Sequence, residues 1–501
     1  MHAVAVDTPG AKGRDFDITS FDGTVIRAHW FPRSTDPEIS SPTVLMGPGW
    51  GSAGDTNDTK VGVLGATTIG SIRDAGYNVL TWDPRGFGNS TGTITIDSPD
   101  YEGRDVEQLI DWVATRPEAA LDAEDDPQMG MVGASYGGGI QLVTAALDCR
   151  IDAIVPVIAW NSLVTSLDKA DTPKTGWSGL LSVSSAGRKL DPTVVHAQTT
   201  ENATGTIDAT DKAWFAAHDP GVGDITIPTL IIQGTVDTLF TLDEGIANYD
   251  ILSKNNVPTS MVWFCGGHGV CLTKAGDQQR VVAAAVAWLN RYVKRDTSVD
   301  TGPGFSFVDQ DGVTYTAPTY SPGSADHSAP AAVSATGSGT LQLVATGGAG
   351  PVTTPGPNGG QLDTFIDQIT PAKADSAVNV PIASTLKADA TIISAPQLTL
   401  SYSGTVAAGD RPMRVFAQLV DDTTGLVIGN QITPIPVTLD GQSHTVAVPL
   451  EAIAFTLHPG ATVTLQLVAT TVAYAQPRLG GSVTFSAIGI DLPVSGGVTR
   501  Q

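Results

Sequence analysis

Ser135 stands in a sequence context that suits a catalytic nucleophile. It is the centre of residues 133–137 (GASYG), a G-x-S-x-G element that follows the apolar run 128–132 and precedes a helical run from Gly139 to Leu147. A strand, a tight turn and a helix in this order form a nucleophile elbow. The flanking glycines avoid clashes in the turn, and the helix N-terminus favours negative charge beside the hydroxyl. The pattern predicts attack of the serine oxygen on a carbonyl carbon.

The same motif occurs a second time without that context. Residues 88–92 (GNSTG) follow residues 83–87 (DPRGF), and no helical run begins after Ser90. A G-x-S-x-G match is informative where a strand precedes it and a helix follows it. We therefore interpret the second match as a loop and keep Ser135 as the predicted nucleophile.

The predicted nucleophile needs a base, because a serine hydroxyl is a weak nucleophile on its own. In nucleophile-elbow enzymes the triad follows the order Ser, Asp or Glu, then His. Asp237 comes just after the strand-like run 229–232, and His268 follows the strand-like run 261–264 within a glycine-rich loop. We predict that His268 takes the proton from Ser135 and that Asp237 holds the imidazole in the correct tautomer.

Other acids and histidines fit these roles less well. Asp243 and Glu244 lie further along the chain, where we interpret them as charges in the first turn of a helix. His196 and His218 fall in the segment 160–225 and are interpreted as surface or pocket residues. We therefore assign the acid to Asp237 and the base to His268.

An oxyanion hole needs two backbone N–H groups near the reacting carbonyl. The residue after the nucleophile, Tyr136, is expected to donate one of them. The second is expected from Trp50, in the glycine-rich residues 47–51 (GPGWG) after the strand-like run 43–46. The alternative for residues 47–51 is a turn with no catalytic role. Loss of one such donor typically costs about 3 kcal/mol of transition-state stabilisation.

The sequence contains three cysteines, and two of them flank the predicted base. Cys265 and Cys271 lie symmetrically about His268, and we expect a disulfide between them if the protein is secreted. Otherwise they are two small buried apolar residues. A Cys and His metal site would have three ligands and would use up the base, so no metal is predicted. Cys149 is expected to be a buried free thiol.

The elements that position these residues alternate in the first part of the chain. Apolar runs typical of buried strands alternate with runs of helical spacing, which predicts a largely parallel sheet with helices on both faces. The strand-like runs are residues 43–46, 78–82, 128–132, 153–158 and 229–232, the helical runs include 104–115 and 278–293, and a hairpin is predicted over 16–31. We interpret residues 1–297 as a catalytic domain of the α/β-hydrolase fold.

Two further regions differ from this alternation. Residues 160–225 contain helical pieces and no core strand, so we predict an inserted helical cap over the active site. After residue 297, short alternating runs separated by turn residues predict an all-β sandwich domain of jelly-roll type, residues 298–501. Its strand-like runs include residues 341–346, 397–403, 414–421, 445–450 and 461–470, and residues 347–360 form a predicted loop.

The composition narrows the range of partners. The formal net charge is -24, which disfavours binding to nucleic acid or to anionic membranes. No apolar run is long enough to span a bilayer, and residues 1–15 lack the apolar core of a signal peptide. The low Lys and high Thr, Ala and Gly content is typical of a secreted bacterial protein.

The motifs together resemble those of the cocaine esterase and X-prolyl dipeptidyl peptidase group of α/β-hydrolases. The resemblance implies hydrolysis of esters or amides through an acyl-enzyme, without metal or cofactor. It also implies that Ser135, Asp237 and His268 are the catalytic residues. The matching pieces are residues 22–24 (DGT), 83–88 (DPRGFG), 133–137, 234–240 (GTVDTLF) and 266–269 (GGHG), together with the C-terminal β domain.

Two departures from that group favour ester over peptide substrates. X-prolyl peptidases carry an extra N-terminal domain, whereas this chain begins almost directly at the hairpin. Cocaine esterase-like members have a tyrosine donor in the oxyanion loop, where this chain has Trp50, so only backbone donation carries over. We therefore predict a carboxylic-ester hydrolase that acts on a small-molecule ester.

Three other functions are compatible with the sequence. A dipeptidyl or acyl-amide peptidase acting on a short peptide would need a carboxylate in the cap to hold the substrate amine. An acyltransferase would use the same acyl-enzyme with an alcohol in place of water, and a binding protein would carry an idle triad. The candidate carboxylates are Asp168, Asp171 and Glu201, and the candidate pocket walls, which could equally be core, are Trp50, Trp160, Trp177 and Trp214.

Overall fold

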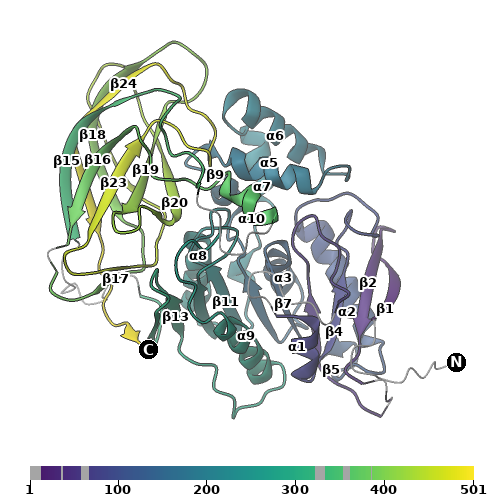
Figure 1. Cartoon of the computed structure of the whole chain (residues 1–501). Coiled ribbons are helices and arrows are strands. Elements are labelled where there is room, and N and C mark those ends of the chain that lie inside the picture. The colour runs from purple at the N-terminus through teal and green to yellow at the C-terminus, as the bar shows by residue number, and fades with distance from the viewer. Residues whose placement is uncertain are drawn as a thin grey trace.

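The computed structural model describes residues 13–34, 36, 38–57, 67–321, 333–353, 361–384 and 386–501. Two predictions, the missing signal-peptide core in residues 1–15 and the loop at residues 347–360, fall partly outside the described residues. The chain forms a large sheet covered by helices, with a β-rich part beside it (Figure 1).

The large sheet has 11 strands, and its central strands are parallel. The strand order is β1 (Arg14–Thr19), β2 (Val25–Phe31), β4 (Asn78–Trp82), β3 (Thr43–Met46), β7 (Met129–Ala134), β8 (Ala153–Val157), β11 (Thr229–Gly234), β12 (Thr259–Phe264), β13 (Phe305–Val308), β14 (Thr314–Ala317) and β25 (Thr499–Arg500). Neighbours from β4 to β13 run parallel, and the remaining pairs are antiparallel. The predicted α/β sheet and its N-terminal hairpin are therefore present.

Helices cover both faces of this sheet, which explains why its strands are apolar along their whole length. On β3, Val44 packs into the cluster that holds α1 (Ile69–Asp74) and α9 (Gln279–Tyr292). The next residue, Leu45, packs into the cluster that holds α2 (Arg104–Ala114) and α8 (Leu242–Lys254). Successive side chains of a strand point to opposite faces, so the two helix pairs lie on opposite sides.

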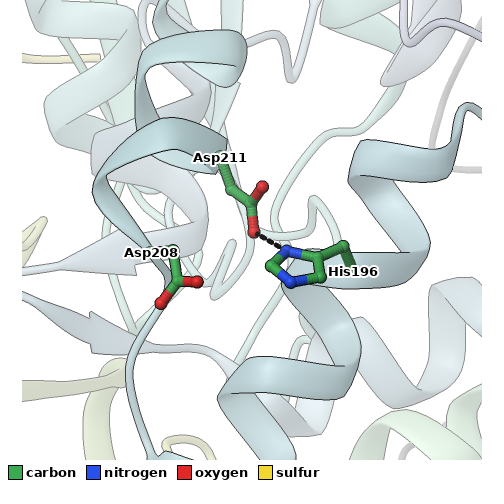
Figure 2. A group of neighbouring side chains, drawn as sticks. All are labelled: His196, Asp208 and Asp211. Atoms are coloured by element: carbon green, nitrogen blue, oxygen red, sulfur yellow. Dashed lines mark hydrogen bonds and ion pairs between the residues drawn. The ribbon is translucent and has the colours of Figure 1, made fainter.

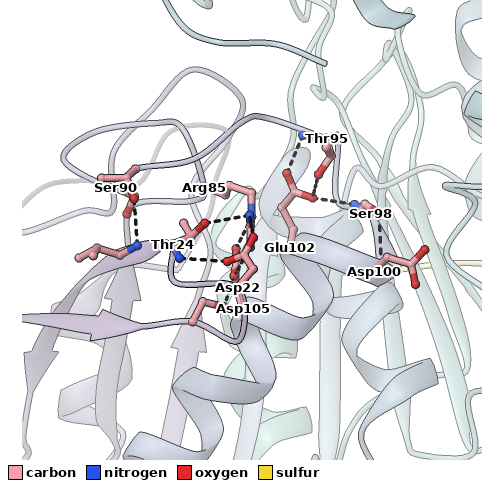
Figure 3. Close-up of polar contacts among 12 residues, drawn as sticks. Asp22, Thr24, Arg85, Ser90, Thr95, Ser98, Asp100, Glu102 and Asp105 are labelled. Carbon is pink, nitrogen blue, oxygen red and sulfur yellow. Dashed lines mark hydrogen bonds and ion pairs between the residues drawn. The ribbon is translucent and has the colours of Figure 1, made fainter. Parts of the chain in front are cut away.

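A buried ionic cluster joins the N-terminal hairpin to the rest of the fold (Figure 3). Arg85 follows β4 and donates to Asp22 in the hairpin turn at 2.6 Å and to Asp105 of α2 at 2.7 Å. In the same loop, Ser90 donates to the carbonyl of Asp83 and accepts from the backbone N–H of Arg27. These bonds show that the second G-x-S-x-G match is a loop, with its serine used in backbone contacts.

The segment between β8 and β11 is mostly helical. It contains α4 (Leu163–Leu167), α5 (Thr175–Ser184), α6 (Pro192–Thr204), α7 (Ala209–Ala216) and the short η3 (Val222–Asp224), with β9 (Asp168–Lys169) and β10 (Thr172–Pro173) as a separate strand pair. Figure 1 shows α5, α6 and α7 at one end of the large sheet, next to the C-terminal strands.

The C-terminal region contains two antiparallel sheets of four strands that enclose an apolar core. One has the order β15 (Val333–Gln342), β24 (Gly481–Leu492), β18 (Gln397–Val406), β21 (His444–Pro449). The other has the order β16 (Ala377–Ala383), β23 (Thr462–Val468), β19 (Arg414–Asp421), β20 (Val427–Pro436). Two shorter strands of this region are β17 (Ala390–Ile392) and β22 (Phe455–Leu457). The first part of the chain also contains the short elements η2 (Pro99–Gly103), β5 (Leu121–Ala123) and β6 (Asp126–Pro127).

The structure differs from the sequence predictions at three places after residue 297. The strand predicted over 341–346 in fact begins at Val333 and ends at Gln342. The prediction missed its first residues because they are small and polar and show little apolar alternation. The helix α10 (Gln361–Asp367) was not predicted; it is too short for a clear helical period. Finally, β13, β14 and β25 belong to the large sheet, so that sheet continues past the predicted boundary at 297.

Candidate active site

The backbone at Ser135 adopts the strained turn expected of a nucleophile elbow. Ser135 joins the end of β7 to α3 (Tyr136–Leu147) and has a φ of 60°, a left-handed value that few non-glycine residues adopt. Gly133 and Gly137 leave no room for side chains, since a Cβ at residue 137 would lie 2.1 Å from the carbonyl oxygen of Gly47. The turn therefore exposes the hydroxyl at the N-terminus of α3, where negative charge is favoured.

The structure brings the three predicted triad residues together. His268 Nε2 lies 2.7 Å from Ser135 Oγ, and His268 Nδ1 lies 2.7 Å from Asp237 Oδ2. Asp237 follows β11 and His268 follows β12, and these adjacent parallel strands end at the same edge of the sheet. The tertiary fold thus connects residues that are 133 and 31 positions apart in the sequence.

Backbone N–H groups hold the acid in place. Asp237 is fully buried, and its Oδ1 accepts from the N–H groups of Leu239 at 3.0 Å and Phe240 at 2.8 Å. Its Oδ2 accepts from the backbone N–H of His268 at 3.0 Å, in addition to the imidazole. These donors fix the direction of the carboxylate, which suits it to orient an imidazole.

The rival acids have other partners. Asp243 and Glu244 lie in the first turn of α8, as predicted. Asp243 pairs with Lys169 at 3.2 Å, and Glu244 accepts from the backbone N–H groups of Asn161 and Ser162. Both carboxylates therefore act in local structure rather than beside Ser135.

The predicted cap histidines also lie apart from the triad. His218 donates through Nδ1 to the carbonyl of Trp214 at 2.6 Å and lies against its ring. His196 of α6 and Asp211 of α7 form an ion pair at 2.8 Å, with Asp208 beside them (Figure 2). Although three such side chains could hold a metal ion, the pair already accounts for their arrangement by linking α6 to α7.

Both predicted oxyanion-hole residues lie beside the nucleophile. Tyr136 is the first residue of α3, so its N–H lies outside the i→i−4 ladder of that helix. Trp50 lines a pocket together with Ser135 and Tyr136. The indole of Trp50 donates to the carbonyl of Leu181 at 3.0 Å, and its ring packs edge-on against Tyr136. The loop 47–51 is therefore held in contact with the elbow and with α5.

The Tyr136 side chain extends beneath the elbow into a buried polar region. Its hydroxyl accepts from the backbone N–H of Asp97 at 3.2 Å and lies 3.4 Å from a carboxylate oxygen of Glu102. Burial raises the pKa of Glu102 to about 7, against hydrogen bonds from Thr95 that lower it. These contacts anchor the first turn of α3 from below.

The pocket in front of Ser135 is largely apolar. Most of its lining comes from the segment 160–225 and from the loop after β11. Its apolar members include Trp50 and Ile96 from the earlier part of the chain, together with Trp160, Leu163, Phe215 and Phe240. Among the other predicted wall residues, Trp177 donates to Thr238 and packs edge-on against the His268 ring, while Trp214 stacks on His218. Trp50 and Trp160 are thus pocket walls, and Trp177 packs against the predicted base, His268.

One of the three candidate carboxylates lines this pocket. Glu201 of α6 accepts a hydrogen bond from Ser178 of α5, and burial raises its pKa to about 7. Asp168 and Asp171 both pair with Lys212. Of the three carboxylates, Glu201 is therefore the one that lies in the pocket with Ser135.

A disulfide joins Cys265 to Cys271 and closes the loop that carries His268. The prediction for Cys149 was wrong, because this free cysteine is exposed. It lies beyond the end of α3, where Arg150 turns back to pair with Asp148 at 2.6 Å. That turn directs residue 149 away from the core.

Two polar residues that contact the triad loops were not found from the sequence. Asn430 and Gln431 of β20 donate to backbone carbonyls of residues 270 and 237. They lie 160 and 194 positions from their partners and belong to no recognisable motif. The alternation of apolar and polar residues predicted several strands of the C-terminal region. It carries no information on which of their side chains face the loops of Asp237 and His268.

The chain is similar to a known protein family and to several solved structures. Residues 22–270 match the model of the X-Pro dipeptidyl-peptidase (S15 family). Among solved structures, an α-amino acid ester hydrolase has a TM-score of 0.68 at 13% identity, with 98% of each chain covered. An aminopeptidase from a marine sediment Thaumarchaeota archaeon has a TM-score of 0.69 at 14% identity, with 96% of each chain covered. These likenesses show that the fold extends over both parts of the chain.

Curated relatives match less than half of the chain. A bis(hydroxyethyl) terephthalate hydrolase from Streptomyces coelicolor is 29% identical over 237 residues, which are 45% of this chain and 72% of that protein. A polyketide transferase from a Penicillium species is 26% identical over 144 residues, so the matched region spans 28% of this chain and 44% of that relative. In the described part of the chain, no helix is long and apolar enough to cross a membrane. The motifs, the family match and the fold together show that this chain is a hydrolase of the cocaine esterase and X-prolyl dipeptidyl peptidase group.

Proposed function

We propose that the chain is a serine hydrolase that cleaves carboxylic esters through an acyl-enzyme intermediate. The observation that carries the proposal is the continuous hydrogen-bond chain from Ser135 Oγ through His268 to Asp237, with 2.7 Å at each step. His268 removes the serine proton as the oxygen attacks the ester carbonyl, and it then protonates the leaving alcohol. Water, activated by the same imidazole, releases the acid.

The backbone N–H groups of Tyr136 and Trp50 are proposed to stabilise the oxyanion. The first lies at the N-terminus of α3, and the second lies in the loop packed against Gly137. Donors held in place before the reaction stabilise the developing charge without reorganisation. The indole N–H of Trp50 is engaged with Leu181, so the proposal assigns donation to its backbone.

We further propose that residues 160–225 act as a cap and that the C-terminal sheets form a jelly roll. Residues of the cap line the pocket in front of Ser135, which supports a role in substrate selection. The eight long C-terminal strands, numbered in chain order, form sheets of order 1-8-3-6 and 2-7-4-5, which agrees with two interlocked Greek keys. Because β13 and β14 complete the large sheet, we place the domain division after them rather than at 297.

The apolar pocket favours an ester with a bulky apolar acyl or alcohol group. Its walls include Trp50, Trp160 and Phe240, and apolar surface removed from water stabilises the bound group. The Streptomyces relative is named as a hydrolase of a terephthalate diester, which supports testing aromatic esters first.

Glu201 favours a second candidate function, cleavage of an ester or amide whose acyl part bears a free amine. The buried carboxyl group lies in a largely apolar pocket and accepts from Ser178, and the ammonium group of a substrate would provide a counter-charge for it. This candidate covers the peptidase alternative, and it differs from the first in requiring the substrate amine.

The test compares p-nitrophenyl esters of graded acyl length with aminoacyl-prolyl p-nitroanilides, using the wild type and Ser135→Ala. Turnover of esters that is lost in the variant, together with labelling of Ser135 by a fluorophosphonate, supports the esterase. Anilide cleavage that requires a free amine would support the second candidate. Turnover that survives in Ser135→Ala would contradict both, and an added alcohol that intercepts the acyl group would indicate acyl transfer.

A further inference from the structure

We propose that Asn430 and Gln431 are positioning residues for the catalytic base and acid, and that the C-terminal β part thereby holds the triad in register. The proposal rests on the triad proposed above. Gln431 Nε2 donates to the backbone carbonyl of Asp237 at 2.7 Å, and Asn430 Nδ2 donates to the carbonyl of Val270 at 3.0 Å. One element thus contacts the loop of the acid and the loop of the base.

Both contacts are buried, which makes them effective constraints. Gln431 is 7% exposed, Asn430 is 4% exposed and Asp237 is 0% exposed. A hydrogen bond lost in such a site leaves a carbonyl oxygen without compensation from water, at a cost larger than that of an exposed bond. The Asp237 carbonyl belongs to the residue whose carboxylate holds His268, so its direction is coupled to the orientation of that carboxylate.

The local backbone of β20 is shaped to present these two amides. The register between β19 and β20 shifts between Gln418 and Val420, where Gln418 pairs with Ile432 and Val420 pairs with Val427. The intervening residues of β20 leave the regular ladder, as in a β-bulge, a device that redirects side chains. Gly429 and Asn430 have φ values of 64° and 58°, left-handed values that glycine and asparagine tolerate best.

The two catalytic loops are also interlocked, so a shift in one reaches the other. A Cβ at Gly269 would lie 1.7 Å from the carbonyl oxygen of Val236, and a Cβ at Gly267 would lie 2.7 Å from Asp237. The Cys265–Cys271 disulfide closes the base loop on its other side. The bulge of β20 therefore contacts a single rigid unit that carries the acid and the base.

A second pair of hydrogen bonds between the same two parts of the chain provides a matched control. Gln310, between β13 and β14, donates to the carbonyl of Thr456 at 2.8 Å and accepts from its N–H at 2.9 Å. This side chain joins the large-sheet part to β22, and its amide bonds with Thr456, whereas the amides of Asn430 and Gln431 bond with the catalytic loops. It has the same amide chemistry as Gln431, so it separates interface stability from triad positioning.

The experiment compares Gln431→Met, Asn430→Gly and the control Gln310→Met. Methionine keeps the side-chain length without the donor, and glycine removes the Asn430 amide without strain at positive φ. We measure kcat and KM on one p-nitrophenyl ester, the rate of Ser135 labelling by a fluorophosphonate, and the melting temperature. All assays are run at least 15 °C below the lowest melting temperature, so that each variant is folded.

We expect both triad-side variants to lower kcat and the labelling rate together by about 10- to 100-fold with KM nearly unchanged, since small misalignments of reacting groups have effects of this size. The control should lower the melting temperature with kcat unchanged. Equal kcat losses in all three variants, or unchanged kcat in both triad-side variants, would overturn the proposal. Retained activity in Ser135→Ala would instead refute the proposed function on which it rests.

Discussion

The carbonyl oxygen of Gly47 lies so close to Gly137 that a Cβ atom at residue 137 would stand 2.1 Å from it. This contact presses the loop 47–51 against the first turn of α3, directly beside Ser135. The distance is shorter than any tolerated contact of a real Cβ. Gly137, two residues after Ser135, thus serves two purposes, the tight elbow and the close approach of the loop that carries the proposed second oxyanion donor.

Gly137→Ala is therefore expected to displace the loop that carries Trp50. The shift would move one proposed oxyanion donor and would lower kcat by about 100-fold, the scale of a misplacement of about 1 Å. Steady-state kinetics on a p-nitrophenyl ester provides the measurement. The matched control is Gly179→Ala in α5, where nothing lies within 4 Å of the added methyl group. It should keep full activity and gain thermal stability from helix propensity, and full activity in both variants would contradict the argument.

Replacement of the acid tests the orientation of the base. Asp237→Asn removes the acceptor that fixes His268 through Nδ1, so the imidazole adopts the wrong tautomer and kcat falls by about 10⁴-fold. Asp243→Asn is the control, because Asp243 pairs with Lys169 in the first turn of α8. We expect it to keep most of its activity. Comparable losses in the two variants would show that Asp237 has no special role.

The disulfide around the base is expected to support turnover. Cys265→Ser combined with Cys271→Ser removes the link that closes the His268 loop, so we expect a lower melting temperature and a kcat reduced by about tenfold, with KM little changed. A double variant with wild-type kcat would show that the glycine contacts alone position His268.

The exposed Cys149 is expected to react with a thiol reagent in the native protein. A native protein that is inert to the reagent would contradict the exposure of Cys149.

The raised pKa of Glu201 implies that the free energy of unfolding depends on pH. Burial raises its pKa from the ordinary 4.5 to about 7, so between these values the folded chain binds a proton that the unfolded chain has lost. Its contribution to stability is complete below about pH 4.5 and decreases as the pH rises to about 7. Glu201→Gln removes this loss, so the melting temperature of the variant relative to the wild type should rise from pH 5 to pH 8.

The same ionisation separates the two candidate functions. If the carboxylate holds a substrate amine, kcat/KM for an amine-bearing ester should rise across the pH range in which Glu201 ionises, relative to an uncharged ester of equal size. Glu201→Gln should abolish that relative rise. Identical profiles for the two esters in the wild type would eliminate amine recognition and leave the apolar ester as the substrate class.

Short-range patterns in the sequence predicted many of the elements and the three residues proposed as the triad, although they missed α10 and the start of β15. Ser135, Asp237 and His268 each follow a buried strand, and because parallel strands end at a common edge, their order along the chain already implied that they meet. The limits of β3, β4 and β19 agree with the predicted runs, since apolar strand composition is a local property. The nucleophile elbow was recognisable for the same reason.

Only the tertiary structure decided which distant side chains surround those residues. It selected Glu201 over Asp168 and Asp171 for the pocket, exposed Cys149, and carried β13, β14 and β25 past residue 297 into the large sheet. It also brought Asn430 and Gln431 to the catalytic loops from 160 and 194 positions away. Such contacts depend on how whole sheets and helices pack, and local residue patterns carry no record of that packing.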